Sequence, residues 1–492
     1  MSTHAEPPAS SSGPRLRFPP QIKYIVGNEA AERFSFYGMR AILTVFATVL
    51  FMEVYPLDRV FAALLAPYTP ESTTLFGHIL AAQKVAEARA EMVFHLFVAA
   101  VYFTPLLGGY ISDRFWGKYH TIIRLSLVYV AGHAVLALWQ SEAGFYLGLA
   151  LIALGAGGIK PCVSAHVGDQ FTQATKSLLP KVFGIFYISI NVGSVVASLV
   201  TPWTNAIWGP EVAFGIPGIL MAVATLVFWL GRHQYITVPP TGPRPDSPAK
   251  VMAVALFRGW KTAITTFGEV RVEDAKAVLR VAGILWPVIM FWALFDQSSS
   301  SWVHLTERMN LHGLRASMFQ AVNAMFILLL IPLFTGVIYP WFDRRGLETT
   351  PIRRMTAGLF VTALSFVSIA VIGHWVAISP PESVSAFWIV VPYFLLTSGE
   401  ILVSVTGLEF AYTQAPRSVK SSVMSIWFLT VAGGNLLAAT VAGLNPFSSW
   451  LVRFLFWAAL TAITAGVFGL LGRSYKMAEY VETDKASAEA NA

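Results

Sequence analysis

The sequence contains very little cysteine and little charge. Its 492 residues include one cysteine, Cys162, which excludes an intrachain disulfide framework and makes a metal site unexpected. Charged residues make up 12% of the chain, which is about half the share found in soluble domains. Hydrophobic residues make up 55%. These proportions exclude an ordinary soluble protein and predict an all-α protein embedded in a lipid bilayer.

The motifs of common enzymes are also missing. No spacing matches a metal site, a nucleophile with its base, or a phosphate-binding loop. The glycine-rich run from Gly155 to Gly158 lacks the Lys-Ser/Thr pair that would complete such a loop, and we expect it to let helices pack closely beside Lys160. We therefore expect neither enzymatic activity nor a cofactor or metal.

About twelve apolar stretches reach the roughly 20 residues that a membrane span requires. Their centres lie near residues 38, 100, 129, 155, 194, 221, 290, 329, 363, 399, 432 and 462. Most of the 34 Lys and Arg residues lie in the tails and in alternate loops, so the positive-inside rule places both termini in the cytoplasm. The net charge of +7 is therefore explained by the orientation of the spans in the membrane, and no nucleic-acid partner is expected.

A long polar connection divides the spans into two sets of six. The predicted units are a cytoplasmic N-terminal tail (1–22), an N-terminal six-helix bundle (23–231), a cytoplasmic linker (232–280), a C-terminal six-helix bundle (281–473) and a cytoplasmic C-terminal tail (474–492). Within the linker, Val251 to Phe267 has the pattern of one amphipathic helix. In the outer loop before the second span, Lys84 to Glu91 is expected to be helical.

Three ionisable residues lie close together at the start of the first span: Glu29, Glu32 and Arg33. Charge within a span is costly and indicates a functional site. Glu29 precedes Arg33 by four residues, which favours an ion pair within the helix. This pairing leaves Glu32 without a partner in its own helix, so Glu32 is the first candidate for the group that takes up a proton.

Two further pairs of opposite charge lie in corresponding helices of the two halves. Counting 1.5 Å per residue places Arg40 and Asp296 at one outer depth, and Lys160 and Glu400 at one inner depth. Pairs of this kind suit a carrier in which each open state breaks one pair and keeps the other. The alternative is that they are fixed ion pairs that only hold the helices together.

His95 lies near the outer end of the second span. Histidine ordinarily changes charge near neutral pH, so His95 suits a point of proton entry. The alternative is a packed residue at the membrane edge.

The segment from Gly108 to Lys118 resembles the cytoplasmic loop motif of the major facilitator superfamily, with one residue more than usual before Gly117. The segment from Glu29 to Tyr37 matches the E-x-x-E-R-F-x-Y-Y signature of the proton-dependent oligopeptide transporter family within that superfamily. Phe186 to Ser194 resembles the F-Y-x-x-I-N-x-G-S signature of the same family. Matching patterns also occur at Phe291–Gln297, Gly399–Leu402 and Trp427–Leu429, and the resemblance covers about residues 20 to 475.

The resemblance implies a major facilitator fold of twelve helices and roles for individual residues. The residues that it implies in proton coupling are Glu29, Glu32 and Arg33, and it favours His95 as well. Asp296 is expected to take part in proton coupling through its pair with Arg40. The residues that the resemblance implies in substrate binding are Arg33, Tyr37, Tyr102, Lys160, Asn191, Trp292, Asn323, Glu400, Ser404 and Trp427. The expected gating salt bridges are Arg40 with Asp296 and Lys160 with Glu400.

The sequence departs from the family pattern in two places that concern the site. Phe36 replaces a tyrosine of the first signature, which removes one hydroxyl group. Val405 follows Ser404 where the family usually has proline, so the tenth span is expected to be less kinked.

The function expected from this resemblance is import of di- and tripeptides with protons, by a monomer in the cytoplasmic membrane of the cell. The alternative is proton-coupled uptake of another small anionic or zwitterionic solute, such as nitrate or an amino acid conjugate.

Overall fold

The computed structural model describes residues 18–54, 75–172, 175–242, 247–416, 419–475 and 477. Within these residues the secondary structure is helical, apart from one isolated bridge between Asn310 and Ser385. The predicted all-α class is confirmed. Residues 1–17 and 478–492, which make up most of the two predicted tails, lie outside the described residues.

The first half of the chain is built from long helices. They are α1 (Ile22–Val54), α3 (Leu75–Ile111), α4 (Gly117–Leu138), α5 (Glu142–Asp169) and α6 (Leu179–Leu230). Gly117 and Gly209 have positive φ angles of 73° and 81°, which glycine adopts at little cost. Gly117 separates α3 from α4, and Gly209 divides α6. The helical stretches that contain these two glycines, Ala82–Leu138 and Lys181–His233, are 57 and 53 residues long, so each crosses a bilayer twice at about 20 residues a span.

The second half contains shorter helices joined within spans. They are α9 (Glu269–Leu285), α10 (Val288–Phe295), α11 (Ser301–Thr306), α12 (Ala321–Leu333), α13 (Tyr339–Arg344), α14 (Pro351–Ile378), α15 (Val390–Glu400), α16 (Thr406–Thr413), α17 (Lys420–Leu444) and α18 (Trp450–Ser474). α9 and the segment 288–306 form one span bent by 50°. π-helical turns at Phe334–Ile338 and Ile401–Val405 join α12 to α13 and α15 to α16.

The described residues contain the predicted number of spans. Nine helical stretches are long and apolar enough to cross a membrane, and the bent pair makes ten. Because the two long stretches of the first half each cross twice, the total is the twelve that the sequence predicts. The tenth span is irregular despite its missing proline, since the π-helical turn follows directly after Glu400, and such turns bend helices.

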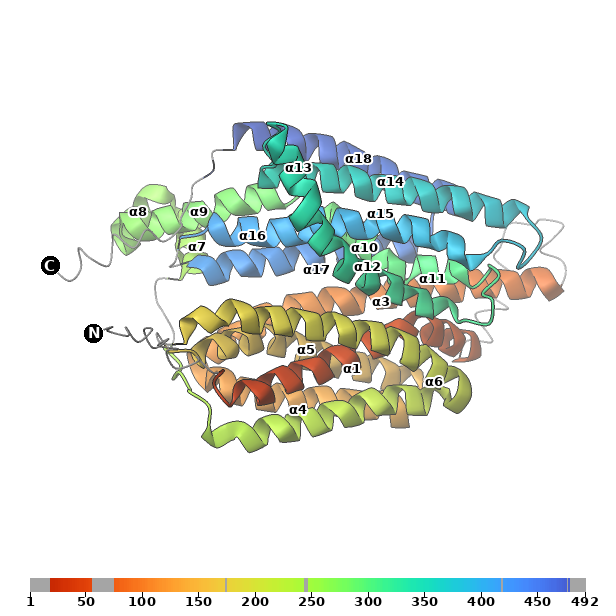
Figure 1. Cartoon of the computed structure of the whole chain (residues 1–492), viewed down its shortest axis with the longest axis horizontal. Coiled ribbons are helices and arrows are strands. Elements are labelled where there is room, and N and C mark those ends of the chain that lie inside the picture. Colours follow the sequence, from red (N-terminus) through yellow and green to blue (C-terminus); the bar gives the residue numbers. More distant parts are fainter. Residues whose placement is uncertain are drawn as a thin grey trace, which may run out of the picture.

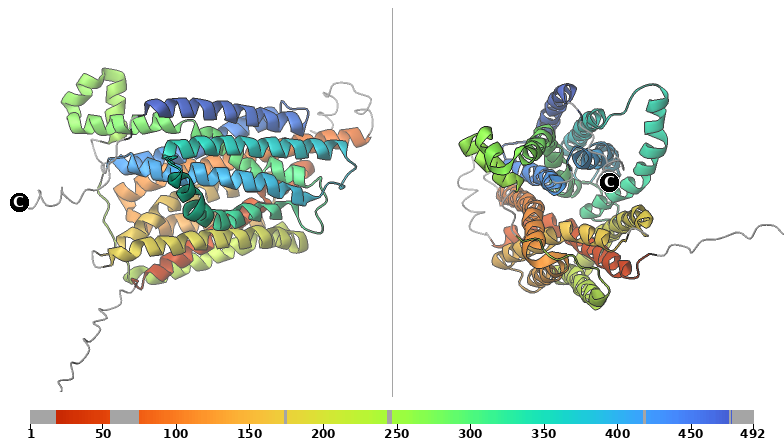
Figure 2. Two further views of the ribbon diagram at one scale, coloured as in Figure 1. Left: turned by 45° about the horizontal axis from the view of Figure 1, so that its top comes forward. Right: turned by 90° about the vertical axis from the view of Figure 1, so that its left-hand side faces the viewer.

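The helices gather in two bundles that lie side by side (Figures 1 and 2). One hydrophobic core belongs to the first half and includes Phe94 and Phe214. Two others belong to the second half and include Phe291 and Phe366. Large apolar side chains also point outward along the spans, as expected for helices that face lipid. The exact limits assigned to the two bundles stay a prediction.

The direction of the helices defines two ends of the molecule (Figure 1). α1 runs from Ile22 to Val54, and α18 runs back from Trp450 to Ser474. We call the end at which α1 ends and α18 begins the far end, and the opposite end the near end.

Two helices replace the single amphipathic helix predicted in the linker. α7 (Pro248–Arg258) and α8 (Trp260–Phe267) are separated by Gly259, whose φ is 84°. The prediction of one continuous helix is therefore wrong, because glycine permits a reversal that the apolar pattern does not reveal. The segment from Lys84 to Glu91 is helical, but it belongs to α3 and does not form a separate loop helix.

Close contacts between glycines fix the position of α3 against α5. A Cβ atom added at Gly108 would lie 2.4 Å from the Cα atom of Gly158. At Gly157 it would lie 1.7 Å from Thr104 Oγ1. The predicted packing role of this glycine-rich run is confirmed. At the near end, Arg114 donates to Thr241 Oγ1 at 2.8 Å and to the carbonyl oxygen of Gly242 at 3.0 Å, so the loop motif holds the start of the linker.

Candidate functional site

The charged stripe of α1 forms a compact and buried cluster. Arg33 Nε lies 2.9 Å from Glu29 Oε1 and 2.6 Å from Glu32 Oε2. All three residues are buried, and Glu32 is fully so. The expectation that Glu32 has no partner within its own helix is wrong, because the long arginine side chain reaches the carboxylate next to it as well as the one a turn earlier. Both carboxylates therefore share one guanidinium group.

The predicted outer pair is present between the two halves. Arg40 of α1 donates to Asp296 Oδ1, and Asn435 Nδ2 of α17 donates to Asp296 Oδ2 at 2.7 Å. One turn further along α1, Thr44 Oγ1 donates to the carbonyl oxygen of Ser299 at 2.9 Å. These buried contacts join α1 to the second half of the chain. The gating role of the pair remains a proposal.

Lys160 and Glu400 do not form their predicted pair in this conformation. Lys160 Nζ lies 4.1 Å from the ring centre of Tyr102 and 4.6 Å from that of Phe36. It has no hydrogen-bond partner among the described residues. Glu400 Oε2 instead accepts a hydrogen bond from Asn323 Nδ2 at 2.8 Å. Arg40 and Asp296 are thus bound to each other, while Lys160 and Glu400 each contact other residues.

A cavity of about 240 Å³ lies between the two halves. It is lined by tyrosines, amides, serines and charged side chains from α1, α3, α6, α10, α12 and α15 together with the turns that follow α10 and α15. The predicted binding residues along its wall are Tyr37, Tyr102, Asn191, Trp292, Asn323, Glu400 and Ser404, and both members of the Arg40–Asp296 pair also line it.

The other predicted binding residues, Arg33, Lys160 and Trp427, are not among the described residues that line this cavity. Trp427 packs edge-on against Trp292, with ring centres 6.1 Å apart. Lys160 contacts the ring of Tyr102, which does line the cavity. Trp427 and Lys160 therefore contact residues of the cavity wall without lining the cavity themselves.

His95 lies inside the interface between the halves and is almost completely buried. Its Nδ1 is 2.8 Å from Asn435 Oδ1, and its Nε2 is 2.9 Å from Ser300 Oγ. Asn435 in turn contacts Asp296. His95 is thus linked through one amide to the outer pair, and it is buried between the two halves. Its part in proton entry stays a prediction.

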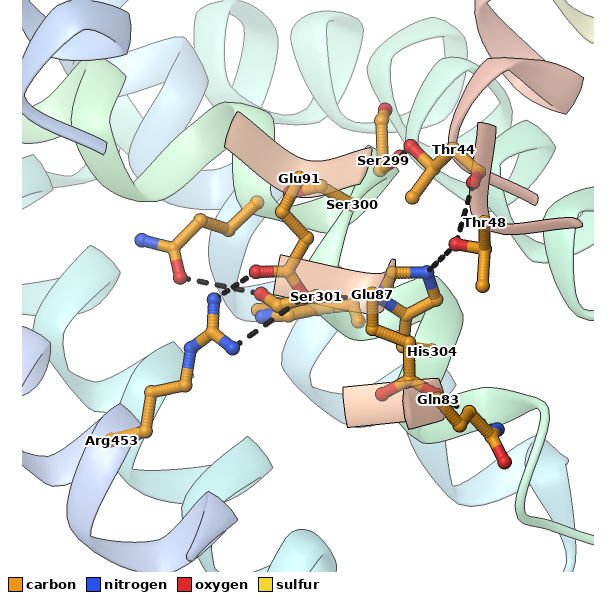
Figure 3. A network of polar contacts seen from close by, with 12 residues as sticks. Thr44, Thr48, Gln83, Glu87, Glu91, Ser299, Ser300, Ser301, His304 and Arg453 are labelled. Carbon is orange, nitrogen blue, oxygen red and sulfur yellow. Dashed lines mark hydrogen bonds and ion pairs between the residues drawn. The ribbon is translucent and has the colours of Figure 1, made fainter. Parts of the chain in front are cut away.

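A second polar network at the far end was not predicted from the sequence (Figure 3). Glu91 of α3 contacts His304 of α11 and Arg453 of α18. Glu87, one turn away on α3, accepts two hydrogen bonds of 2.9 Å from Arg308. The signal for this network was the spacing of Glu87, Glu91 and His95, which puts all three on one face of a helix. The network was not predicted because Glu87 and Glu91 were expected to lie in an outer loop.

The polar contacts between the halves, among the described side chains, all lie towards the far end. No group of three or more His, Cys, Asp or Glu residues suited to a metal ion occurs in the described part of the chain.

Comparison with protein families gives a match to the POT family over residues 119–271 and 261–446. Peptide transporter family 1 of Drosophila melanogaster is 34% identical over 73% of this chain and 48% of its own length. Solute carrier family 15 member 1 of Oryctolagus cuniculus is 24% identical over 93% of each chain. Solute carrier family 15 member 2 of Danio rerio is 33% identical over 74% of this chain and 52% of its own length. The chain thus spans about half the length of two of these relatives.

Solved structures share the fold over nearly the whole chain. The POT family transporter PepTSo is 38% identical, with a TM-score of 0.82 over 94% of this chain and 99% of that one. An auto-inhibited POT family peptide transporter is 36% identical, with the same TM-score and the same coverage.

Proposed function

The chain belongs to the POT family, and on this basis we propose that it imports di- and tripeptides together with protons by alternating access. It is an integral membrane transporter of the cell membrane and not an enzyme. Relatives whose names describe them as peptide transporters support the substrate class. Both walls of the cavity come from one chain, which supports a monomeric carrier.

The observation that carries this proposal is the arrangement of opposite charges around the cavity. Glu400, held by Asn323, offers a carboxylate to the ammonium group of a peptide. Lys160 offers a buried ammonium group that has no hydrogen-bond partner among the described residues and lies against Tyr102 in the cavity wall. A buried unpaired charge is costly, and a peptide carboxylate would supply the missing partner. A zwitterion needs separated groups of this kind.

The contacts at the far end support alternating access. With Arg40 bound to Asp296, the far end is tied together while Lys160 and Glu400 have separate neighbours. We assign the far end to the outside of the cell, following the distribution of positive charge in the sequence. This conformation then corresponds to a carrier that is closed to the outside.

Proton coupling is assigned to the cluster of Glu29, Glu32 and Arg33. Protonation of Glu32 would leave Arg33 with Glu29 as its only anionic partner in this cluster, and would change how strongly the guanidinium attracts a peptide carboxylate. A carrier with glutamine at position 32 should therefore still exchange peptide but lose its link to the proton gradient.

The test is transport by the protein reconstituted in liposomes. Glu32→Gln should retain counterflow of labelled dialanine but no longer accumulate dialanine when a proton gradient is applied. Glu273→Gln is the control, because Glu273 is exposed on α9 and remote from the cavity; it should accumulate peptide as the wild type does. Accumulation by Glu32→Gln would contradict the coupling role. Failure of unlabelled peptides to compete in the wild type would instead favour a different small solute.

A further inference from the structure

His304 joins four helices at the far end. It is fully buried on α11, and its ring lies between α1 and α3 (Figure 3). Its Nδ1 is 3.0 Å from Glu91 Oε1, and its Nε2 is 3.0 Å from Thr48 Oγ1. The other oxygen of Glu91 accepts from Arg453 of α18. One imidazole ring thus links both halves of the molecule.

The partners of His304 decide which of its nitrogens carry hydrogen. An ionised carboxylate only accepts hydrogen bonds, so contact with Glu91 requires a hydrogen on Nδ1. The Thr48 hydroxyl has one hydrogen, which it donates to the carbonyl oxygen of Thr44 at 3.0 Å. In that arrangement Thr48 accepts from His304 Nε2, 3.0 Å away, which requires a hydrogen on Nε2 as well. An imidazole that donates from both nitrogens carries a positive charge.

From this geometry we propose that His304 is a second proton-binding site, which holds its proton while the far end is closed and releases it when the far end opens. One proton from the water on the far side adds to the neutral ring, and no other bond forms or breaks. This site is separate from the cluster on α1 and from His95, whose two ring nitrogens face Asn435 and Ser300.

The charges around His304 agree with a cation at this place. From α3 it faces Glu91 and, one turn away, Glu87, and from α18 it faces Arg453, which is bound to Glu91. At the end of its own helix, Glu307 lies close by and Arg308 donates to the carbonyl oxygen of His304 at 2.8 Å. Arg308 is itself bound to Glu87. α1 contributes the neutral Thr48. The carboxylates of Glu87, Glu91 and Glu307 thus lie close to two guanidinium groups, those of Arg308 and Arg453, and to the ring of His304.

Loss of the proton would weaken the closure of the far end. A neutral imidazole can donate from only one nitrogen, so either Glu91 or Thr48 would lose its hydrogen bond. Opening of the far end separates α1 and α3 from α11 and α18, which breaks these same contacts. Proton binding at His304 and closure should therefore strengthen each other, since coupling between two equilibria is reciprocal.

This inference rests on the proposed alternating access, but its test requires no peptide. Cysteines introduced by Ala143→Cys and Ser383→Cys place spin labels on exposed far-end positions of the two halves, in a background in which Cys162→Ser removes the natural thiol. Distances between the labels in nanodiscs report the closed and open populations. In the wild type, lowering the pH from about 8 to about 5 should raise the ratio of closed to open molecules roughly tenfold.

His304→Gln should abolish most of this response to pH. Thr48→Val keeps the side-chain shape and removes only the acceptor, and it should reduce the pH response. It also provides a test if His304→Gln does not fold. His133→Gln is the matched control, because His133 is equally buried but lies in α4 outside this network, with its Nδ1 3.3 Å from the carbonyl oxygen of Phe214 and its ring against that of Tyr129; it should respond as the wild type does.

An unchanged pH response in both His304→Gln and Thr48→Val, or no response in the wild type, would overturn the proposal. Failure of peptide counterflow would contradict the proposed function but would leave these distances unaffected, so the two failures can be told apart.

Discussion

Glu400 and Asn323 show how single side chains prepare the cavity for a charged ligand. Asn323 Nδ2 donates to both Glu400 Oε2 and Thr397 Oγ1, at 2.8 Å and 3.0 Å, and so holds the carboxylate at the cavity wall. An amide that fixes a carboxylate in this way reduces the cost of ordering it when a ligand binds. The ammonium group of a peptide can then approach an acceptor that is already in place.

Replacement of this carboxylate should weaken peptide binding in a way that depends on the charge of the ligand. Glu400→Gln should weaken binding of dialanine by about 1.5–3 kcal/mol, as for loss of a hydrogen bond to a charged group. N-acetyl-dialanine lacks the ammonium group, so its binding to the wild type should already be weaker and should change little in the variant. Isothermal titration of both ligands against both proteins measures this difference. An equal loss for the two ligands would show that Glu400 does not contact the amino end.

Close packing of α3 against α5 depends on glycines at single positions along the two helices. The Cα atom of Gly158 leaves no room for a side chain at Gly108, whereas a Cβ atom at the neighbouring Gly109 would meet only Pro161, at 3.9 Å. Small residues let helices in a membrane approach closely. The same helices carry Tyr102 and Lys160, so their separation also sets the distance between these two side chains.

Gly108→Ala should therefore destabilise the protein, while Gly109→Ala should not. The first substitution forces two backbones apart and should cost about 1–3 kcal/mol, as overpacking does in protein cores. The second adds a good helix former in open space. Thermal unfolding in detergent can be followed with a thiol-reactive dye, because the single cysteine, Cys162, is buried and reacts only after unfolding. Equal midpoints for the two variants would contradict this account of the helix contact.

For the whole molecule, the uneven distribution of polar contacts is the main finding. Ion pairs and hydrogen bonds between the halves gather towards the far end, from Arg40 and Asp296 near the cavity to Glu87 and Arg308 further out. Breaking several buried charge pairs at once is costly, so a substrate or a proton must offset part of that cost. Opening of the far end is thus expected to be cooperative across α1, α3, α11 and α18.

A covalent link across the far end should stop transport without removing the binding site. Thr44→Cys with Ser299→Cys, in the background lacking Cys162, places two thiols on segments that are in contact, since Thr44 Oγ1 lies 2.9 Å from the carbonyl oxygen of Ser299, and an oxidant is used to link them. Oxidation should abolish peptide uptake in liposomes, and a reducing agent should restore it. Each single cysteine variant serves as a control and should be insensitive to oxidation. Transport by the fully cross-linked protein would rule out opening at this end.

The sequence was sufficient for the class of protein, the number of spans and several of the residues that line the cavity. Apolar segments of a fixed length report membrane crossing directly, because the bilayer demands about 20 residues of each helix. Counting residues along each span also brought Arg40 and Asp296 to one depth, and the structure pairs them. Charged residues of this kind can be recognised as a pair in the sequence because charge is rare in spans.

Only the tertiary structure decided which partner each charge has. Arg33 bridges two carboxylates of its own helix, Lys160 lies against aromatic rings, and Glu91 meets residues more than two hundred positions away in sequence. Helical periodicity specifies the face on which a side chain lies, but not the rotation of that helix against its neighbours or the state of the gate. Those depend on long-range packing of the two halves, which also determines the hydrogen-bond partners from which we infer the charge of His304.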